Sequence, residues 1–262
     1  MLSYEELENI AKLKRLSLVN AEKDYLQELI LFSIYSNAGK ELVFKGGTAL
    51  YKIYKLNRFS EDLDFTLTKK LDIEKVSNKI ASDLMLLNIV ARIKEIKEYR
   101  NEINVRLLLK GPLYKGSKER QCFIPLNISK REQTLEPEKK TIVSMFREIP
   151  SFEIFIMKEE EILAEKIRAI FTRQKPRDIY DLWFLLTMKN INVDIELINE
   201  KLSIYSLKFN FKEFESKIEK MKGLWQIDLK NLIIGELPDF DKVKKELIEN
   251  LKGKLSAKEK LL

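Results

Sequence analysis

The chain has 262 residues, enough for one large or two ordinary hydrophobic cores, and it carries a formal net charge of +7. It contains no histidine and one cysteine, which excludes an internal disulfide, histidine-ligated or cysteine-rich zinc, and imidazole catalysis. The sequence contains no apolar run of about 18 residues, the length that a membrane span needs, and its first residues do not resemble a secretory signal. We therefore expect a cytoplasmic protein without a membrane partner. The basic excess suits a polyanionic partner.

In chain order, the first half of the sequence alternates between helical and strand-like patterns. A capping box of Ser3 and Glu6 opens a helix that is predicted to run to Arg15. Asn20 is predicted to cap a second helix, which ends near Asn37. The next predicted elements are a strand from Glu41 to Lys45, a helix from Ala49 to Tyr54, a strand from Leu63 to Leu67 and a helix from Leu71 to Leu87.

Three further β-type runs follow, from Lys97 to Leu109, from Arg120 to Ile128 and from Ser151 to Met157. The first two are predicted to form a hairpin, and Pro125 indicates an edge strand or a bulge. From Lys158 onwards the pattern is helical, beginning with helices from Lys158 to Thr172 and from Pro176 to Met188. We therefore predict an α+β fold with an α/β domain over residues 1–157 and an all-helical domain over 158–262.

The turn Gly46-Gly47-Thr48 lies between a predicted strand and a predicted helix. Free backbone amides at a helix start attract phosphate, and glycine allows the phosphate to approach the backbone closely. The spacing is not that of a P-loop. The alternative interpretation is an ordinary helix start.

Asp62 and Asp64 flank Leu63 at the start of a predicted strand, so that their carboxylates share one face. Two such carboxylates can hold Mg²⁺ or Mn²⁺, which neutralises nucleotide phosphates during in-line attack. The alternative is a solvated acidic turn. Arg58, just before them, could pair with Asp62 or meet a phosphate.

The order of these motifs along the chain is more specific for a protein family than either motif is alone. A strand, Gly-Gly-Thr, a helix and then Asp-x-Asp on the next strand resemble nucleotidyltransferases with the polymerase-β-like fold. The segment FKGGTALYKIYKLNRFSEDLDF is similar to the AbiEii/AbiGii toxins, including MenT-type toxins, of abortive-infection and toxin–antitoxin systems. This resemblance implies a polymerase-β-like core followed by a helical lobe. It also implies an NTP substrate bound at Gly46, Gly47, Thr48, Arg58 and Ser60, with the metal at Asp62 and Asp64.

A second block supports the resemblance. The segment EILAEKIRAIFTRQKPRDIYDLWFLL resembles the family's lysine helix and the aspartate motif that follows it. Lys166 matches the active-site lysine and Asp181 the downstream aspartate, and the resemblance implies that both are catalytic. Taken by themselves, Asp178 near a helix start could stabilise the helix dipole, and Arg177 with Asp178 could tie two helices together.

One position departs from the fold's pattern. A third carboxylate usually follows on a later strand, where this chain has Asn127. Asparagine can bind a metal through its carbonyl oxygen but cannot act as a general base. Glu102 on the preceding β-type run is the alternative third carboxylate. Ser60 matches a serine that carries a regulatory phosphate in MenT-type relatives, and otherwise its hydroxyl caps a turn.

Three functions remain open from the sequence. The first is a toxin that transfers NMP from an NTP to an acceptor, plausibly the 3′ end of tRNA, and that is countered by a cognate antitoxin. The second is a module that binds a nucleotide such as GTP without transferring it, which would fit Asn127. The third is a housekeeping nucleotidyltransferase that acts on RNA ends or on a small molecule such as an aminoglycoside.

Overall fold

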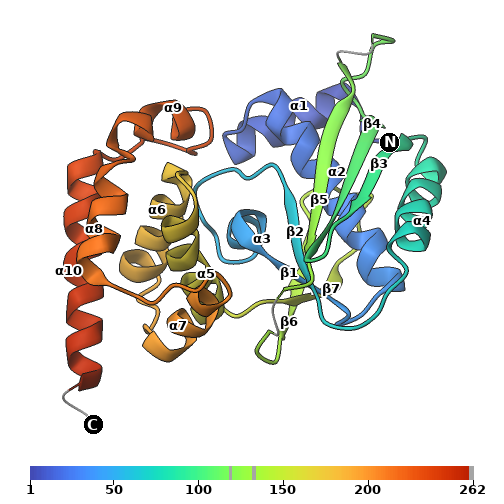
Figure 1. Ribbon diagram of the computed structural model, residues 1–262. Coiled ribbons are helices and arrows are strands. Elements are labelled where there is room, and N and C mark those ends of the chain that lie inside the picture. Colours follow the sequence, from blue (N-terminus) through green and yellow to red (C-terminus); the bar gives the residue numbers. More distant parts are fainter. Residues whose placement is uncertain (118–119, 132–133, 260–262) are drawn as a thin grey trace. The chain divides into compact units, whose positions relative to one another are not determined.

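The computed structural model describes residues 1–117, 120–131 and 134–259 and is shown in Figure 1. The chain forms two compact units. The first contains Met1–Lys55 and Phe59–Met157, and the second contains Leu56–Arg58 and the residues from Lys158 onwards. The end of the predicted helical domain, residues 260–262, lies outside the described part. The short segment Leu56–Arg58 therefore belongs with the helical unit, although the chain on either side of it belongs to the sheet unit.

The first unit is built on a mixed sheet. Its elements in chain order are α1 (Tyr4–Lys14), α2 (Leu18–Asn37), β1 (Leu42–Lys45), α3 (Gly46–Lys52), β2 (Leu63–Leu67), α4 (Ile73–Leu86), β3 (Val90–Glu98), β4 (Glu102–Lys110), β5 (Cys122–Ser129), β6 (Glu138–Ile142) and β7 (Phe152–Ile156). The seven strands found among the described residues have the order β3-β4-β5-β2-β1-β7-β6. The pairs β2–β5 and β1–β7 are parallel, and the other neighbouring strands are antiparallel. Helices α2 and α4 pack on the sheet, and α1 packs on α2 (Figure 1).

The alternation of side chains gives the central strands one apolar and one polar face. On β2, Leu63 and Phe65 are buried, whereas Asp64 between them is half-buried. On β5, Leu126 and Ile128 are buried and Asn127 is half-buried. Because successive side chains of a strand point to opposite faces, the polar residues of neighbouring strands share one face of the sheet.

The second unit is helical. It contains α5 (Glu159–Thr172), α6 (Pro176–Trp183), the π-helical turn η2 (Phe184–Met188), α7 (Ile195–Ser203), α8 (Phe211–Glu219), the 3₁₀ turn η3 (Lys222–Leu224), α9 (Trp225–Leu229) and α10 (Phe240–Glu259). Helix α5 packs against α6, α7 and α8, and α10 packs against α6. Among the described residues, no helix is both long and apolar enough to cross a membrane.

The α+β prediction is confirmed, and β2 has the predicted bounds. Two helix starts differ from the prediction. The cap of α2 is Ser17, whose hydroxyl accepts a hydrogen bond from the Asn20 amide at 3.2 Å, so Asn20 lies inside the helix. Helix α3 begins at Gly46 and not at Ala49, so the glycine pair forms its first turn.

The strand predictions needed two corrections. β3 and β6 were not predicted, and the run from Lys97 to Leu109 spans the end of β3, a turn and β4. The antiparallel pairing of β4 with β5 is confirmed, but β5 is a central strand and not the edge strand or bulge that Pro125 suggested. Proline is tolerated there because the ladder with β2 starts one residue later, at Leu126, so Pro125 replaces no ladder hydrogen bond on that side.

Candidate active site

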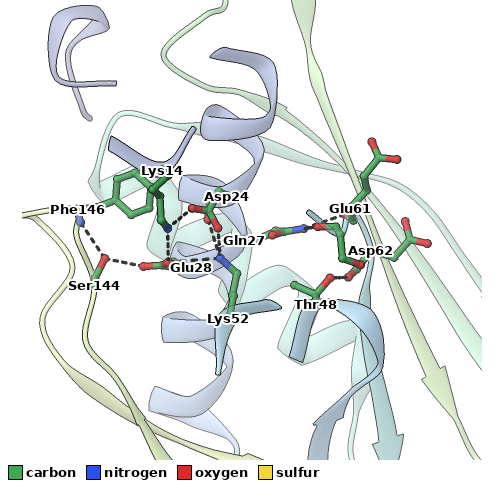
Figure 2. Close-up of polar contacts among 11 residues, drawn as sticks. Lys14, Asp24, Gln27, Glu28, Thr48, Lys52, Glu61, Asp62, Ser144 and Phe146 are labelled. Atoms are coloured by element: carbon green, nitrogen blue, oxygen red, sulfur yellow. Dashed lines mark hydrogen bonds and ion pairs between the residues drawn. The ribbon is translucent and has the colours of Figure 1, made fainter. Parts of the chain in front are cut away.

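The glycine turn and the aspartate pair meet within the sheet unit. β1 and β2 are antiparallel with Lys45 opposite Asp64, so the residue before the turn lies beside the second aspartate. The hydroxyl of Thr48 donates a hydrogen bond to the backbone carbonyl of Asp62 (Figure 2). Gly46 has φ of +76°, and a Cβ added there would lie 2.5 Å from Oδ2 of Asp64. The turn therefore needs glycine at position 46, both for its left-handed backbone and for the close approach of the carboxylate.

Asn127 lies directly beside Asp64, where the sequence pattern placed the missing third carboxylate. The two residues are register partners on the parallel strands β2 and β5. The Asn127 amide nitrogen Nδ2 donates to Oδ1 of Asp64 at 3.0 Å, and its carbonyl Oδ1 accepts from Nη1 of Arg106 at 2.9 Å. The amide is therefore held between a carboxylate and a guanidinium.

Glu102, the alternative third carboxylate, has no place beside Asp64. Its register partner on β5 is Ser129, two positions along that strand from Asn127, and β5 lies between β4 and β2. Its carboxylate accepts a hydrogen bond from Asn104 at 3.2 Å and forms an ion pair with Arg131. Glu102 therefore balances a neighbouring arginine.

The segment before the aspartates is held by a glutamine from α2. Gln27 is buried, and its Nε2 donates to the backbone carbonyls of Ser60 and Glu61, both at 3.0 Å (Figure 2). Lys23 forms an ion pair with Glu61 at 2.6 Å. Ser60 is itself buried. These contacts fix the backbone that leads into Asp62.

Lys166 and Asp181 meet in the helical unit, together with Arg58. Lys166 on α5 contacts carboxylate oxygens of Asp178 at 2.9 Å and of Asp181 at 2.6 Å, both on α6. Arg58 donates from Nε and Nη2 to the two oxygens of Asp181, each at 2.8 Å. Arg173 adds two hydrogen bonds to Asp178, at 2.7 and 2.8 Å. The partner of Arg58 is thus Asp181, a pairing that the sequence did not suggest.

Both aspartates of this cluster remain ionised. Burial raises the pKa of Asp181, but the charges and hydrogen bonds of Arg58 and Lys166 outweigh it, so the pKa lies below its ordinary value. Burial likewise raises the pKa of Asp178, and Lys166 and Arg173 more than offset this effect. The cluster is a buried network of alternating charges, in which each carboxylate is held by two cations. Asp178 therefore does more than stabilise a helix dipole.

The predicted site residues form two groups, one in each unit. Within the sheet unit the structure brings together Gly46, Gly47, Thr48, Ser60, Asp62 and Asp64. Within the helical unit it brings together Arg58, Lys166 and Asp181.

Sequence reasoning missed a second buried charge network, in the sheet unit. Nζ of Lys52 lies 2.5 Å from a carboxylate oxygen of Asp24 and 3.4 Å from one of Glu28, and Lys14 pairs with both carboxylates (Figure 2). The hydroxyl of Ser144 donates to Glu28 at 2.6 Å. The available signal was a pair of acids, Asp24 and Glu28, at positions i and i+4 among the apolar residues of α2. Because Lys52 is on α3 and both acids are on α2, the network links these two helices.

The carboxylates of the candidate site suit a metal ion that is bound partly by the protein and partly by the substrate. Among the described residues, no three Asp, Glu, Cys or His side chains gather closely enough to hold a metal. Asp62 lies just before β2 and Asp64 lies on it, so two carboxylates are two positions apart in the chain, and glycine at position 46 lets the turn approach Oδ2 of Asp64 closely. Mg²⁺ is typically held by one or two carboxylates together with substrate phosphates, so two are sufficient.

Several solved structures share the fold. A protein from Helicobacter pylori assigned as a nucleotidyltransferase superposes with a TM-score of 0.65 at 24% identity, over 94% of this chain and 99% of that one. JHP933 from the same organism gives 0.63 at 23% identity, over 94% and 96% of the two chains. MenT4, a nucleotidyltransferase toxin of Mycobacterium tuberculosis, gives 0.64 at 15% identity, over 95% and 88%.

At these identities the structural likeness shows the fold alone. No curated protein matches the chain significantly. The family follows from the sequence profile described as "Nucleotidyl transferase AbiEii toxin, Type IV TA system", which matches residues 29–246. That match includes the glycine turn, the aspartate pair and the lysine and aspartate motifs of α5 and α6. The chain belongs to the AbiEii family of nucleotidyltransferase toxins.

Proposed function

We propose that the protein is a metal-dependent nucleotidyltransferase toxin that transfers NMP from an NTP to the 3′ end of a tRNA. The observation that carries the proposal is the convergence of the Gly46-Gly47-Thr48 turn with Asp62 and Asp64. The backbone amides of the turn would bind the triphosphate. The two carboxylates would hold Mg²⁺ or Mn²⁺, which when bound neutralises phosphate charge.

The reaction is an in-line displacement. The acceptor 3′-hydroxyl oxygen forms a bond to the α-phosphorus, the bond from that phosphorus to the α–β bridging oxygen breaks, and pyrophosphate leaves. The hydroxyl proton passes to solvent, because Asn127 provides no base. Within the helical unit, Asp178 and Asp181 hold the ammonium of Lys166, the lysine that the family motif marks as catalytic, and Arg58 binds Asp181.

The biological setting follows from the family. A type IV toxin–antitoxin family implies a cognate antitoxin that counters the activity. Substrates such as NTPs and tRNA imply that the protein acts in the cytoplasm, and the net charge of +7 suits an RNA acceptor.

The test is a transfer assay. Purified protein is incubated with each α-labelled NTP, Mg²⁺ or Mn²⁺, and total tRNA. We expect label in the tRNA with the wild type and none with Asp62→Asn, which removes the charge but keeps the shape. Glu74→Gln, at an exposed position in the first turn of α4, is the control and should label as the wild type does. The absence of label with all four NTPs, and with protein as a second acceptor, would contradict the proposal.

A second function is favoured by one observation. Asn127 gives the site two carboxylates where the fold usually has three, which suits binding of a nucleotide such as GTP without transfer. Calorimetric titration with each NTP separates the two functions. Binding without label in the transfer assay would favour the nucleotide-binding module.

A further inference from the structure

The Asn127 amide is held in one orientation by the residues on either side of it. Its Oδ1 accepts from Arg106 at 2.9 Å, and its Nδ2 donates to Asp64 at 3.0 Å. The opposite orientation would place the amide NH₂ against the guanidinium, two donors face to face. It would also place the amide oxygen against the carboxylate, two acceptors face to face. The carbonyl oxygen that could bind a metal therefore already accepts from Arg106, and a cation bound there would lie next to the guanidinium.

Arg106 forms no ion pair with the described residues, although Glu95 on β3 is its register partner and pairs with Lys97 instead. It lies on β4 opposite Pro125, is half-buried, and points its guanidinium at the row that contains Asn127 and Asp64. Within the described parts of the chain, its one hydrogen bond goes to Asn127, and it forms no ion pair. A guanidinium has five N–H donors in a planar fork that suits phosphate oxygens. The geometry thus leaves Arg106 with donors for an anion next to Asp64.

We propose that Arg106 and Asn127 together take the place of the third carboxylate, so that the site holds one divalent cation rather than two. The proposal rests on the nucleotidyltransferase function above. Three carboxylates would carry a total charge of −3, whereas the side chains of Asp62, Asp64 and Arg106 together carry −1. A second divalent cation would be repelled by the positive charge of the guanidinium. Arg106 supplies that positive charge itself by donating to a phosphate of the bound nucleotide, and Asn127 positions both Arg106 and Asp64.

Metal stoichiometry is the first readout. The protein is saturated with an α,β-methylene analogue of the NTP that binds in calorimetry, and bound Mn²⁺ is counted from the loss of the free-ion signal in electron paramagnetic resonance. We expect one Mn²⁺ per protein–nucleotide complex in the wild type. The double variant Asn127→Asp/Arg106→Gln restores the third carboxylate and removes the guanidinium, so it should raise the count to two. A count of two in the wild type, or of one in the double variant, would overturn the inference.

Nucleotide affinity is the second readout. A hydrogen bond to a charged group contributes about 1.5–3 kcal/mol, so Arg106→Gln should weaken binding of the analogue at least roughly tenfold while the Mn²⁺ count stays at one. Arg92→Gln is the matched control, because Arg92 is an exposed arginine on the neighbouring strand β3 and should leave affinity unchanged. Equal affinity for Arg106→Gln and wild type would refute the role of Arg106.

The outcomes separate this inference from the function on which it rests. If the wild type binds no NTP analogue, both fail. If the analogue binds with two Mn²⁺, or without help from Arg106, the proposed function stands and the inference alone fails. Circular dichroism of each variant distinguishes a lost site from a lost fold, and Arg106→Lys, which keeps the charge but not the fork, should bind with intermediate affinity.

Discussion

Removing Arg58 should destabilise the helical unit far more than removing a partly exposed arginine. The Arg58 side chain is 1% exposed, and that of its partner Asp181 is 0% exposed. Arg58→Met keeps much of the apolar volume but leaves Asp181 with Lys166 as its remaining cation in the described contacts. Breaking a buried ion pair by removing one partner costs about 3–5 kcal/mol, because the other charge stays buried.

The loss can be read as a shift in urea denaturation. With an m-value of about 2 kcal/mol/M, a loss of about 3–5 kcal/mol lowers the midpoint by roughly 1.5–2.5 M. Both tryptophans of the chain, Trp183 on α6 and Trp225 on α9, lie in the helical unit. Tryptophan fluorescence therefore reports unfolding of the unit that contains the perturbation, whatever the sheet unit does.

Two further variants make the test decisive. Arg177→Met is the control, because Arg177 is 26% exposed and its ion pair with Asp228 spans 3.9 Å, so we expect a loss below about 1 kcal/mol. The double variant Arg58→Met/Asp181→Leu removes both charges and should be more stable than Arg58→Met alone. The reasoning is wrong if Arg58→Met costs no more than Arg177→Met, or if the double variant is the less stable of the two.

Three further predictions concern the same structure. Gly46→Ala puts a Cβ 2.5 Å from Oδ2 of Asp64 at a φ of +76°, so nucleotidyl transfer should be lost. The free energy of unfolding, measured by far-UV circular dichroism, should fall by about 1–2 kcal/mol, and full transfer activity would contradict this. Thr48→Val removes the hydrogen bond to the carbonyl of Asp62 and should cost about 0.5–1.5 kcal/mol in the same measurement, whereas no loss would mean that the bond contributes nothing. The two buried aspartates of α6 have lowered pKa values, so their stabilisation is complete above about pH 4, the ordinary carboxyl pKa, and is lost as the pH falls further; urea midpoints that stay constant from pH 5 to pH 3 would argue against it.

Local signals in the sequence predicted the helices of the first half, apart from the starts of α2 and α3, and the central strand of the site. The capping box of Ser3 and Glu6 is present, and β2 has its predicted bounds, because caps and side-chain alternation depend on residues close in sequence. The two missed strands are the edges of the sheet. Edge strands carry charged side chains that prevent further pairing, so β3 and β6 lack the apolar alternation that identifies a strand.

The sequence by itself determined the family and the residue types at the candidate site, including the absence of a third carboxylate at Asn127. The tertiary structure decided what those residues contact. Arg58 and Asp181 are 123 positions apart, and Asp64 and Asn127 are 63 apart. Such pairings depend on strand register and helix packing, which are set by the burial of the whole core and not by neighbouring residues. That is why the orientation of the Asn127 amide and its partner Arg106 emerged only from the folded chain.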